Sequence, residues 1–394
     1  ANPNYRAAHF GKWHIGMEPK VAGFDKDDGM PTNGGGEIFA ESYINHGDYV
    51  KDTKEYLQKN NMPNPLNAKM VGKPSLYWSD ENPKDMFGIT KRAKDFMTES
   101  IKAGNPFYVQ LSHYATHLSL ASTKETYEYF KAKAKGDRHK SPEFAAMLKD
   151  LDTSVGMVLN FVKESGIEDN TYIFLMGDNG GRLSFNQMAS LDENRKLIEA
   201  HYTDEDDRNV PLRDGKHSLY EGGLRVPFMA SGPGIESNRV SNTPVTGLDL
   251  LPTFADLAGF TGDFPSVIDG GSMKPLLLDS ISEKVKRSKD ALYFHQSSHR
   301  PSRSAVRLGD YKLVKYWSKE SKYEDTPKVQ LFDISKDLSE QKDLSKEKPS
   351  KTLELENLLS EFIKETKTVT TKRDIESGVY RLMDDLGMRG GSDE

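Results

Sequence analysis

The sequence predicts an α/β protein with a mixed sheet flanked by helices, followed by a smaller C-terminal subdomain of antiparallel strands and one helix. Two observations predict this class. As far as about residue 287, short apolar runs alternate with segments of helical apolar spacing, the pattern of α/β proteins. Beyond it the apolar runs are short and closely spaced, before one amphipathic segment. We therefore expect a large domain over residues 1–287 and a subdomain over residues 288–394.

In the large domain, three apolar runs predict strands and two segments predict helices. The strands are expected at residues 107–111, 172–176 and 226–230, and the helices at residues 142–165 and 247–260. Ser141 is a residue type that caps helices, and Gly166 suits a helix end, so the first helix has clear boundaries. The second strand leads into a glycine-rich turn, where open α/β sheets form ligand crevices.

The C-terminal subdomain is expected to be a small sheet closed by one helix. Apolar runs at residues 291–296, 304–317 and 329–334 predict its strands. Apolar spacing at residues 350–366 predicts the helix.

The composition excludes several classes of protein and site. The 54 basic and 60 acidic residues give a formal net charge of −6, so we expect no nucleic-acid partner. No apolar run reaches the roughly 18 residues that a membrane span requires, so we expect no such span. The chain has no cysteine, which excludes disulfides and thiolate metal sites. The oligomeric state is left open.

Side chains suited to an oxyanion ester follow several of the predicted strands. Positive charge or protons could come from Lys12, His14, His113, His117 and Lys216, and oxygens suited to calcium or magnesium from Asp178 and Asn179. Cations can hold the charge of nonbridging oxygens while an acid protonates the leaving oxygen. Taken one at a time, these residues have simpler interpretations. A lysine beside a tryptophan can pack its stem along the aromatic ring, an Asp-Asn-Gly sequence can form a tight turn, and a histidine after a strand can be structural.

Two long polar regions are expected to form surface loops. Residues 23–85 are rich in Gly, Asn, Pro and Asp and are interpreted as loops that carry specificity. The loop at residues 180–215 contains an acidic run, which is interpreted as solvated. His295, in the first strand of the subdomain, is a candidate substrate-binding residue. A strand histidine at the seam of the subdomain is an equally good interpretation.

Five blocks of sequence carry a resemblance to a known family. They are GKWHIG at 11–16, LSHYATH at 111–117, GDNGG at 177–181, GKHSLYEGGLRVPF at 215–228 and SAVRLGDYKLV at 304–314. In this order they resemble the type I sulfatases, formylglycine-dependent enzymes of the alkaline phosphatase superfamily, and most closely the bacterial members that desulfate polysaccharides. The resemblance implies an alkaline-phosphatase-like fold. It also implies a periplasmic or secreted enzyme that hydrolyses a sulfate ester on a sulfated carbohydrate.

The resemblance assigns roles to the candidate residues. It implies that Lys12 and His14 hold the sulfate group and the hydroxyls of formylglycine, with His113 either on the sulfate side or behind the residues that touch it. It implies that His117 and Lys216 act at the bridging oxygen as the alcohol leaves.

For the metal, the resemblance implies calcium, with magnesium as an alternative, held in part by Asp178 and Asn179. The residues from Tyr220 to Gly223 are expected to be structural, because the glycines allow a close turn that directs Lys216 inward.

The nucleophile motif of the family, a Cys or Ser followed by x-Pro-x-Arg, is expected upstream of the 11–16 block, with two further calcium-binding Asp residues. HRPSR at residues 299–303 is interpreted as a loop that leads into a strand. We therefore expect that about 100 residues precede this chain, the size of a βαβαβ unit. The chain alone is expected to show no sulfatase turnover and weak calcium binding.

Two other functions remain open from the sequence. One is a phosphodiesterase or phosphonate hydrolase on the same fold, because sulfate and phosphate esters make similar demands on a cationic pocket. The other is a non-catalytic protein that binds sulfated glycans.

Overall fold

The computed structural model describes residues 4–29, 77–78, 82–117, 121–136, 141–181, 209–279, 282, 284–296, 302–317 and 328–368. The chain divides into two compact units, one of residues 1–171 with 184–207, the other of residues 172–183 with 208–394. The boundary predicted from the sequence, between residues 287 and 288, lies inside the second unit and stays a prediction. Much of the two predicted long loops, and residues 299–301 of the HRPSR stretch, lie outside the described residues.

The first unit contains a parallel sheet of three strands in the order β2-β1-β4. The strands are β1 (Arg6–Gly11), β2 (Lys26–Asp27) and β4 (Phe107–Ser112). β4 confirms the strand predicted at residues 107–111. β1 was not predicted, because Arg6 and His9 interrupt its apolar run. A separate parallel pair is formed by β3 (Tyr77–Trp78) and β5 (Ala121–Ser122).

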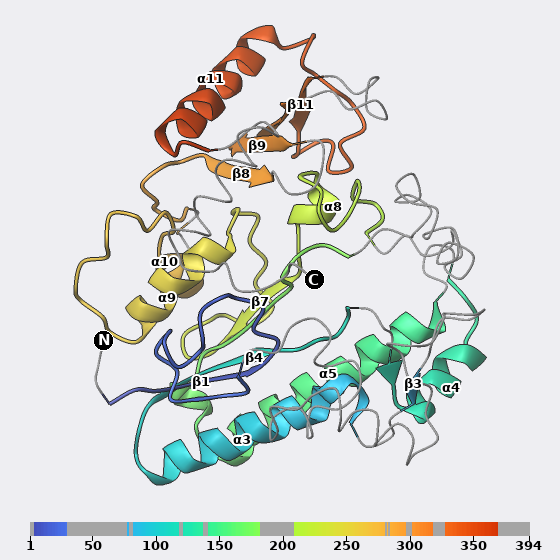
Figure 1. Cartoon of the computed structure of the whole chain (residues 1–394), viewed down its shortest axis with the longest axis vertical. Helices are drawn as coiled ribbons and strands as arrows, with labels where there is room; N and C mark the ends of the chain where they lie inside the picture. The colour runs from blue at the N-terminus through green and yellow to red at the C-terminus, as the bar shows by residue number, and fades with distance from the viewer. Residues whose placement is uncertain are drawn as a thin grey trace, which may run out of the picture. The chain divides into compact units, whose positions relative to one another are not determined.

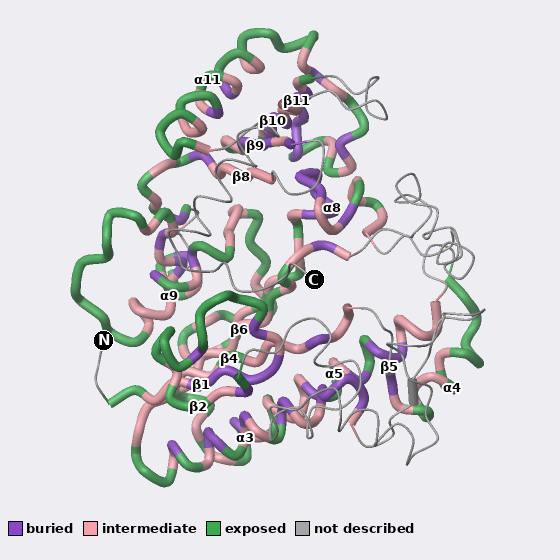
Figure 2. The backbone as a smooth tube through the Cα atoms, viewed as in Figure 1, coloured by how far each residue is buried: buried purple, intermediate pink, exposed green. Residues whose placement is uncertain are grey.

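Helices pack against this sheet and against one another. They are α3 (Met86–Lys102), α4 (Lys124–Ala132) and α5 (Pro142–Glu164), with 3-10 turns at Pro83–Asp85 and Glu168–Asn170. α3 lies along β1 and β4 (Figure 1). Its buried Ile89, Ala93 and Phe96 form one hydrophobic cluster with Ala8 and Phe10 of β1. Figure 2 shows buried positions recurring along α3 between exposed ones, as expected for an amphipathic helix.

α5 confirms the helix predicted after Ser141, whose side chain caps it. The residues that α5 buries are not all those that its apolar spacing predicts. Leu148 and Leu159, which were expected to be buried, are 48% and 44% exposed. Asp150 is buried instead, and it accepts a hydrogen bond from the N–H of Thr123, the N-cap residue of α4, at 2.6 Å. A carboxylate therefore joins α5 to the start of α4, and this contact orients the helix.

The second unit opens with an antiparallel pair of strands. Its elements before the C-terminal sheet are β6 (Ile173–Met176), α8 (Glu221–Leu224), β7 (Phe228–Ser231), a 3-10 turn (Gly247–Asp249), α9 (Leu250–Leu257) and α10 (Lys274–Leu278). β6 and β7 confirm two predicted strands, and the 3-10 turn with α9 confirms the helix predicted at 247–260. Phe174 of β6 packs edge-on against Phe254 of α9, with ring centres 5.0 Å apart.

The C-terminal sheet is antiparallel, with the order β11-β10-β9-β8. Its strands are β8 (Leu292–Gln296), β9 (Arg303–Leu308), β10 (Tyr311–Tyr316) and β11 (Val329–Asp333), and α11 spans Pro349–Glu365. These elements confirm the predicted sheet and helix.

Both faces of this sheet are covered. On one face, Leu313 of β10 clusters with Leu355 and Leu359 of α11. On the other, Val314 of β10 clusters with Leu219, which belongs to the segment that carries Lys216. Successive residues of a strand point to opposite faces, so β10 contacts both layers. Within the described ranges, no helix combines the length and apolar character needed to cross a bilayer.

Asp249 is a fully buried charge in the second unit. Arg287 donates two hydrogen bonds to its carboxylate, from Nε at 2.8 Å and from Nη2 at 2.7 Å. The N–H groups of Thr246 and Gly271 donate two more. Burial acts to raise the pKa of Asp249, but these hydrogen bonds outweigh it and lower the pKa. The ionised carboxylate therefore stabilises the start of α9.

Replacing Asp249 with Asn is expected to lower the free energy of unfolding by about 3 kcal/mol at pH 7, because Arg287 would stay buried without its counter-charge. Since the folded-state pKa of Asp249 is lowered, its contribution is complete above the unfolded value of about 4 and is lost as the pH falls through the folded value. Urea unfolding at pH 7 and at steps below pH 4 measures both effects.

The matched control is Asp256→Asn, which removes a half-exposed pair with Lys274. It is expected to cost at most about 1 kcal/mol. Equal losses of unfolding free energy in the Asp249 and Asp256 variants would contradict a larger contribution from the buried pair.

Candidate active site

Four candidate residues lie at one edge of the sheet of the first unit: Lys12, His14, His113 and His117. β1 and β4 are parallel neighbours that end level with each other. Lys12 and His14 follow the end of β1, and His113 and His117 follow the end of β4. The structure therefore brings these four candidates to the carboxyl edge of the sheet, where α/β sheets bind ligands. His14 is exposed, and Lys12 and His117 are half-buried.

The turn before Lys12 is fixed by hydrogen bonds from the main chain. The N–H of Gly11 donates to Oδ2 of Asp28 at 2.8 Å, and the N–H of Lys12 donates to the carbonyl oxygen of Ser112 at 2.8 Å. Gly11 has φ +92°, and a Cβ there would lie 2.3 Å from that carbonyl oxygen, so only glycine fits. Trp13 is buried and anchors the segment, while its neighbours on either side are more exposed.

A buried ion cluster ties this turn to α3. Nη2 of Arg92 lies 2.8 Å from Oδ2 of Asp28 and 2.6 Å from Oδ2 of Asp85. Burial raises the pKa of Asp85, although its hydrogen bonds with Arg92 act in the opposite direction. Asp28 therefore links the Gly11 N–H to a guanidinium on the helix. The sequence did not indicate this cluster, because both aspartates fall in the stretch interpreted as surface loops.

His113 is half-buried just after the end of β4. Burial, together with the charge of Arg92, lowers its pKa to about 4. Its Nδ1 is enclosed and has no hydrogen-bond partner among the described residues. The lowered pKa disfavours a charged His113 at neutral pH, so we expect it to act through hydrogen bonds.

In the second unit, main-chain hydrogen bonds hold the Asp178–Asn179 turn against the segment of Lys216. The N–H of Lys216 donates to the carbonyl oxygen of Gly181 at 2.9 Å. The N–H of Gly180 donates to the carbonyl oxygen of Gly223 at 3.0 Å. The structure thus brings together two of the sequence blocks that are far apart along the chain.

These two segments touch backbone to backbone. A Cβ on Gly180 would lie 1.7 Å from the carbonyl oxygen of Gly222, and a Cβ on Gly222 would lie 2.1 Å from that of Asp214. No side chain fits at either position. The glycines of the GDNGG and EGGL stretches therefore allow the close approach that places Lys216 beside the turn.

Asp178 and Asn179 offer part of a cation site. Oδ1 of Asp178 accepts a hydrogen bond from the N–H of Asn179 at 2.8 Å, and the side-chain NH₂ of Asn179 donates to the carbonyl oxygen of Gly180 at 2.9 Å. Their hard oxygens fit calcium, which takes six to eight oxygen ligands. Among the described residues no group of three or more His, Asp or Glu side chains could hold a metal, so these two residues supply only a fraction of such a site.

His295 lies within the C-terminal sheet. Its Nδ1 is 2.8 Å from Oγ of Ser304 on the neighbouring strand, and Nε1 of Trp317 donates to the same hydroxyl at 2.7 Å. Arg303, also on that strand, donates to the carbonyl oxygen of His217, the residue after Lys216. His295 thus has the contacts of a structural strand histidine, and its role toward a substrate stays a prediction.

The candidate residues form two groups with complementary chemistry. The first unit presents a lysine and histidines at a sheet edge. The second presents a lysine beside a carboxylate and an amide. The first group can bind an anion, and the second can bind a cation and donate a proton.

Comparison with known proteins identifies the class to which this arrangement belongs. The family model described as Sulfatase matches residues 1–260, and a model described as N-sulphoglucosamine sulphohydrolase, C-terminal, matches residues 214–368. The chain belongs to the sulfatase family. Its fold is the alkaline-phosphatase-like fold of sulfatases, as the sequence predicted.

Individual relatives agree with this assignment. A sulfatase from Formosa agariphila is 28% identical over 397 residues, covering 89% of this chain and 66% of the relative, and human arylsulfatase A is 29% identical over 240 residues, covering 59% and 40%. The crystal structure of Ps i-CgsB is 25% identical with a TM-score of 0.65, covering 91% of this chain and 71% of that chain. Ps i-CgsB was also solved in complex with k-i-k-neocarrahexaose. This chain therefore spans two thirds or less of the length of these two curated relatives.

Replacing Gly180 with Ala is expected to lower the free energy of unfolding by about 2 to 3 kcal/mol, because the new methyl group overlaps the Gly222 carbonyl oxygen and must push the two segments apart. The control is Gly156→Ala in α5, where a Cβ meets nothing within 4 Å. That change should stabilise the chain by about 0.5 to 1 kcal/mol. Chemical unfolding measures both, and a neutral effect of Gly180→Ala would contradict the backbone contact.

Proposed function

We propose that the full-length protein hydrolyses sulfate esters on a sulfated carbohydrate. Membership of the sulfatase family supports the reaction. The observation that carries the proposal is the main-chain linkage that fixes Lys216 beside the Asp178–Asn179 turn. The complex of Ps i-CgsB with k-i-k-neocarrahexaose supports a sugar as the substrate class.

In this proposal Lys12 and His14 bind the sulfate group. The main-chain hydrogen bonds of Gly11 and Lys12 fix the turn in advance, so little rearrangement is needed when the anion binds. The charge of the nonbridging oxygens is then stabilised by a cation held in place. His113, neutral and enclosed, contributes a hydrogen bond and no charge.

Lys216 and His117 act at the bridging oxygen. As the bond between sulfur and this oxygen breaks, one of them donates a proton to the leaving alcohol. The other stabilises the developing negative charge. In this proposal His295 and the polar stretch over residues 23–85 determine which sugar is accepted.

The family resemblance adds formylglycine and calcium to the proposal. Formylglycine would supply the hydroxyl that attacks sulfur, and calcium would neutralise charge on the sulfate oxygens. Asp178 and Asn179 are the residues of this chain that would hold the cation, with ligands from outside the described residues. The 394 residues include no cysteine, so a cysteine-derived formylglycine would lie outside them. From the same resemblance we propose that the enzyme acts in the periplasm or outside the cell.

The function is tested by comparing kcat/KM of the full-length protein for a sulfated oligosaccharide and for the matched phosphate ester. We expect the sulfate ester to react at least about tenfold faster. Faster hydrolysis of the phosphate ester would favour a phosphodiesterase or phosphonate hydrolase. Binding of the sulfated sugar without turnover would favour a glycan-binding protein.

Replacing Lys216 or His117 with Ala should slow the hydrolysis of alkyl sulfates by about 100-fold or more, because their leaving alcohols need a proton. Activated aryl sulfates should be affected much less, since their leaving oxygen is stable as an anion. Initial rates across a series of leaving groups measure the difference.

Lys336→Ala is the control, because this lysine is 81% exposed and lies 3.4 Å from Asp333, three residues earlier in the chain. Its rates should match those of the parent. Equal losses on alkyl and aryl sulfates in the Lys216 and His117 variants would mean that these residues bind without protonating.

A further inference from the structure

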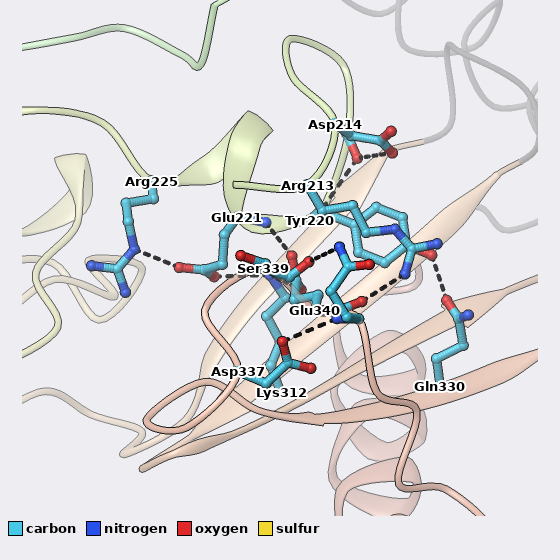
Figure 3. A network of polar contacts seen from close by, with 12 residues as sticks. Arg213, Asp214, Tyr220, Glu221, Arg225, Lys312, Gln330, Asp337, Ser339 and Glu340 are labelled. Atoms are coloured by element: carbon cyan, nitrogen blue, oxygen red, sulfur yellow. Dashed lines mark hydrogen bonds and ion pairs between the residues drawn. The ribbon is translucent and has the colours of Figure 1, made fainter. Parts of the chain in front are cut away.

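A cluster of buried charges lies where the C-terminal sheet meets the segment of Lys216 (Figure 3). The side chain of Lys312, on β10, is 1% exposed. Its ammonium lies 2.9 Å from Oε1 of Glu221 and 2.7 Å from Oε1 of Glu340. Nε of Arg225 donates to Oε2 of Glu221 at 2.8 Å. Lys312 and Arg225 thus pair directly with these carboxylates, and the charge of Arg307, on β9, also acts on both of them.

Glu340 holds the segment at two points on either side of Lys216. Its carbonyl oxygen accepts a hydrogen bond from Nη1 of Arg213 at 3.0 Å, and its carboxylate accepts one from the N–H of Glu221 at 2.6 Å. The segment also closes on itself, because the N–H of Gly222 donates to the carbonyl oxygen of Arg213 at 2.8 Å. Lys216 lies inside this closed loop, whose two ends share one anchor.

The apolar contacts between the loop and the sheet constrain the position of the loop less strictly than polar contacts do. Leu219 and Tyr220 pack on the face of the sheet formed by Val314 and Phe332. Hydrophobic contacts are non-directional and tolerate small shifts. Ion pairs and hydrogen bonds between buried groups require fixed distances and angles. Directional contacts therefore set where the loop sits on the sheet. They are the charged cluster, the hydrogen bonds of the Tyr220 hydroxyl with Gln330 and Tyr316, and the hydrogen bond from Arg303 to the carbonyl oxygen of His217.

Net stability does not account for the cluster, because the cost of removing charges from water offsets much of their attraction. Burial acts to raise the pKa of both carboxyl groups. At Glu340 burial prevails and the pKa is raised, whereas at Glu221 Lys312 and Arg225 outweigh it and the pKa is lowered. A geometric role explains why charged groups occupy a position that apolar side chains could fill.

We propose that Lys312 is a positioning residue for Lys216. By binding Glu221 and Glu340 at once, its ammonium fixes the closed loop over residues 213–222 on the sheet and so sets the place of the Lys216 amine. The consequence for catalysis rests on the proposed function of Lys216. The clamp itself rests on the contacts alone.

The test uses two double variants of the same chemistry on opposite faces of β10. Lys312→Met with Glu340→Gln removes one charge of each sign from the cluster, so its net charge is unchanged and Glu221 keeps Arg225. Lys315→Met with Glu356→Gln is the matched control, since that pair lies 2.7 Å apart and joins β10 to α11 instead. The single variant Lys312→Met, which leaves a buried charge unbalanced, serves as the more severe case.

The first measurement is hydrogen exchange of the full chain, which requires no activity. Amides of the loop, including those of Lys216 and Gly222, should exchange at least about tenfold faster in the Lys312/Glu340 variant while amides of β10 and β11 stay protected. The Lys315/Glu356 variant should leave the loop unchanged. Equal loop exchange in the two double variants would overturn the proposal, whatever their activities.

The second measurement is the leaving-group series in the full-length enzyme. The Lys312/Glu340 variant should reproduce the pattern of Lys216→Ala, with losses on alkyl sulfates at least about tenfold greater than on activated aryl sulfates. Combining it with Lys216→Ala should add little further loss, because both act through one amine. A uniform loss on all substrates would overturn the positioning role. If Lys216→Ala itself shows no leaving-group dependence while loop exchange is faster, the proposed function of Lys216 fails and the clamp stands.

Discussion

The second unit depends on the buried ammonium of Lys312. An enclosed charge must be matched by counter-charges at short distances, and Glu221 and Glu340 supply them from two separate segments. The sheet that carries this lysine also binds α11 on its other face. The C-terminal sheet is therefore a structural support of the Lys216 segment, which covers its second face, and the sequence match over residues 214–368 spans both.

The first unit contains a similar cluster of buried charges. Arg92 binds two buried carboxylates, and one of them, Asp28, accepts the Gly11 N–H just before Lys12. In both units a cation on a regular element binds two carboxylates, and one carboxylate of each pair, Asp28 or Glu340, accepts a main-chain N–H close in sequence to a candidate lysine. Loops have few packing contacts of their own, so such anchors give them a defined position. Each of the two candidate lysines thus follows or lies within an anchored segment.

The environment of the candidate residues separates their chemical roles. Burial lowers the pKa of His113 to about 4, whereas the side chain of His14 is exposed to solvent. Asp178 and Asn179 present hard oxygens on a turn that main-chain hydrogen bonds attach to the segment of Lys216. Residue types alone did not distinguish a charged histidine from an uncharged one, because the pKa depends on burial and on neighbours such as Arg92.

The sequence by itself determined the features that depend on short-range patterns. Apolar runs located β4, β6 and the C-terminal strands, and capping residues located α5, because these features need only neighbouring residues. Ordered blocks such as GKWHIG and GDNGG were sufficient to indicate the family. The tertiary structure alone decided which charges are buried together: Arg92 with Asp28, and Lys312 with Glu340. The reason is that a buried ion pair is defined by the distance between side chains on separate elements, and no local spacing of residues encodes that distance.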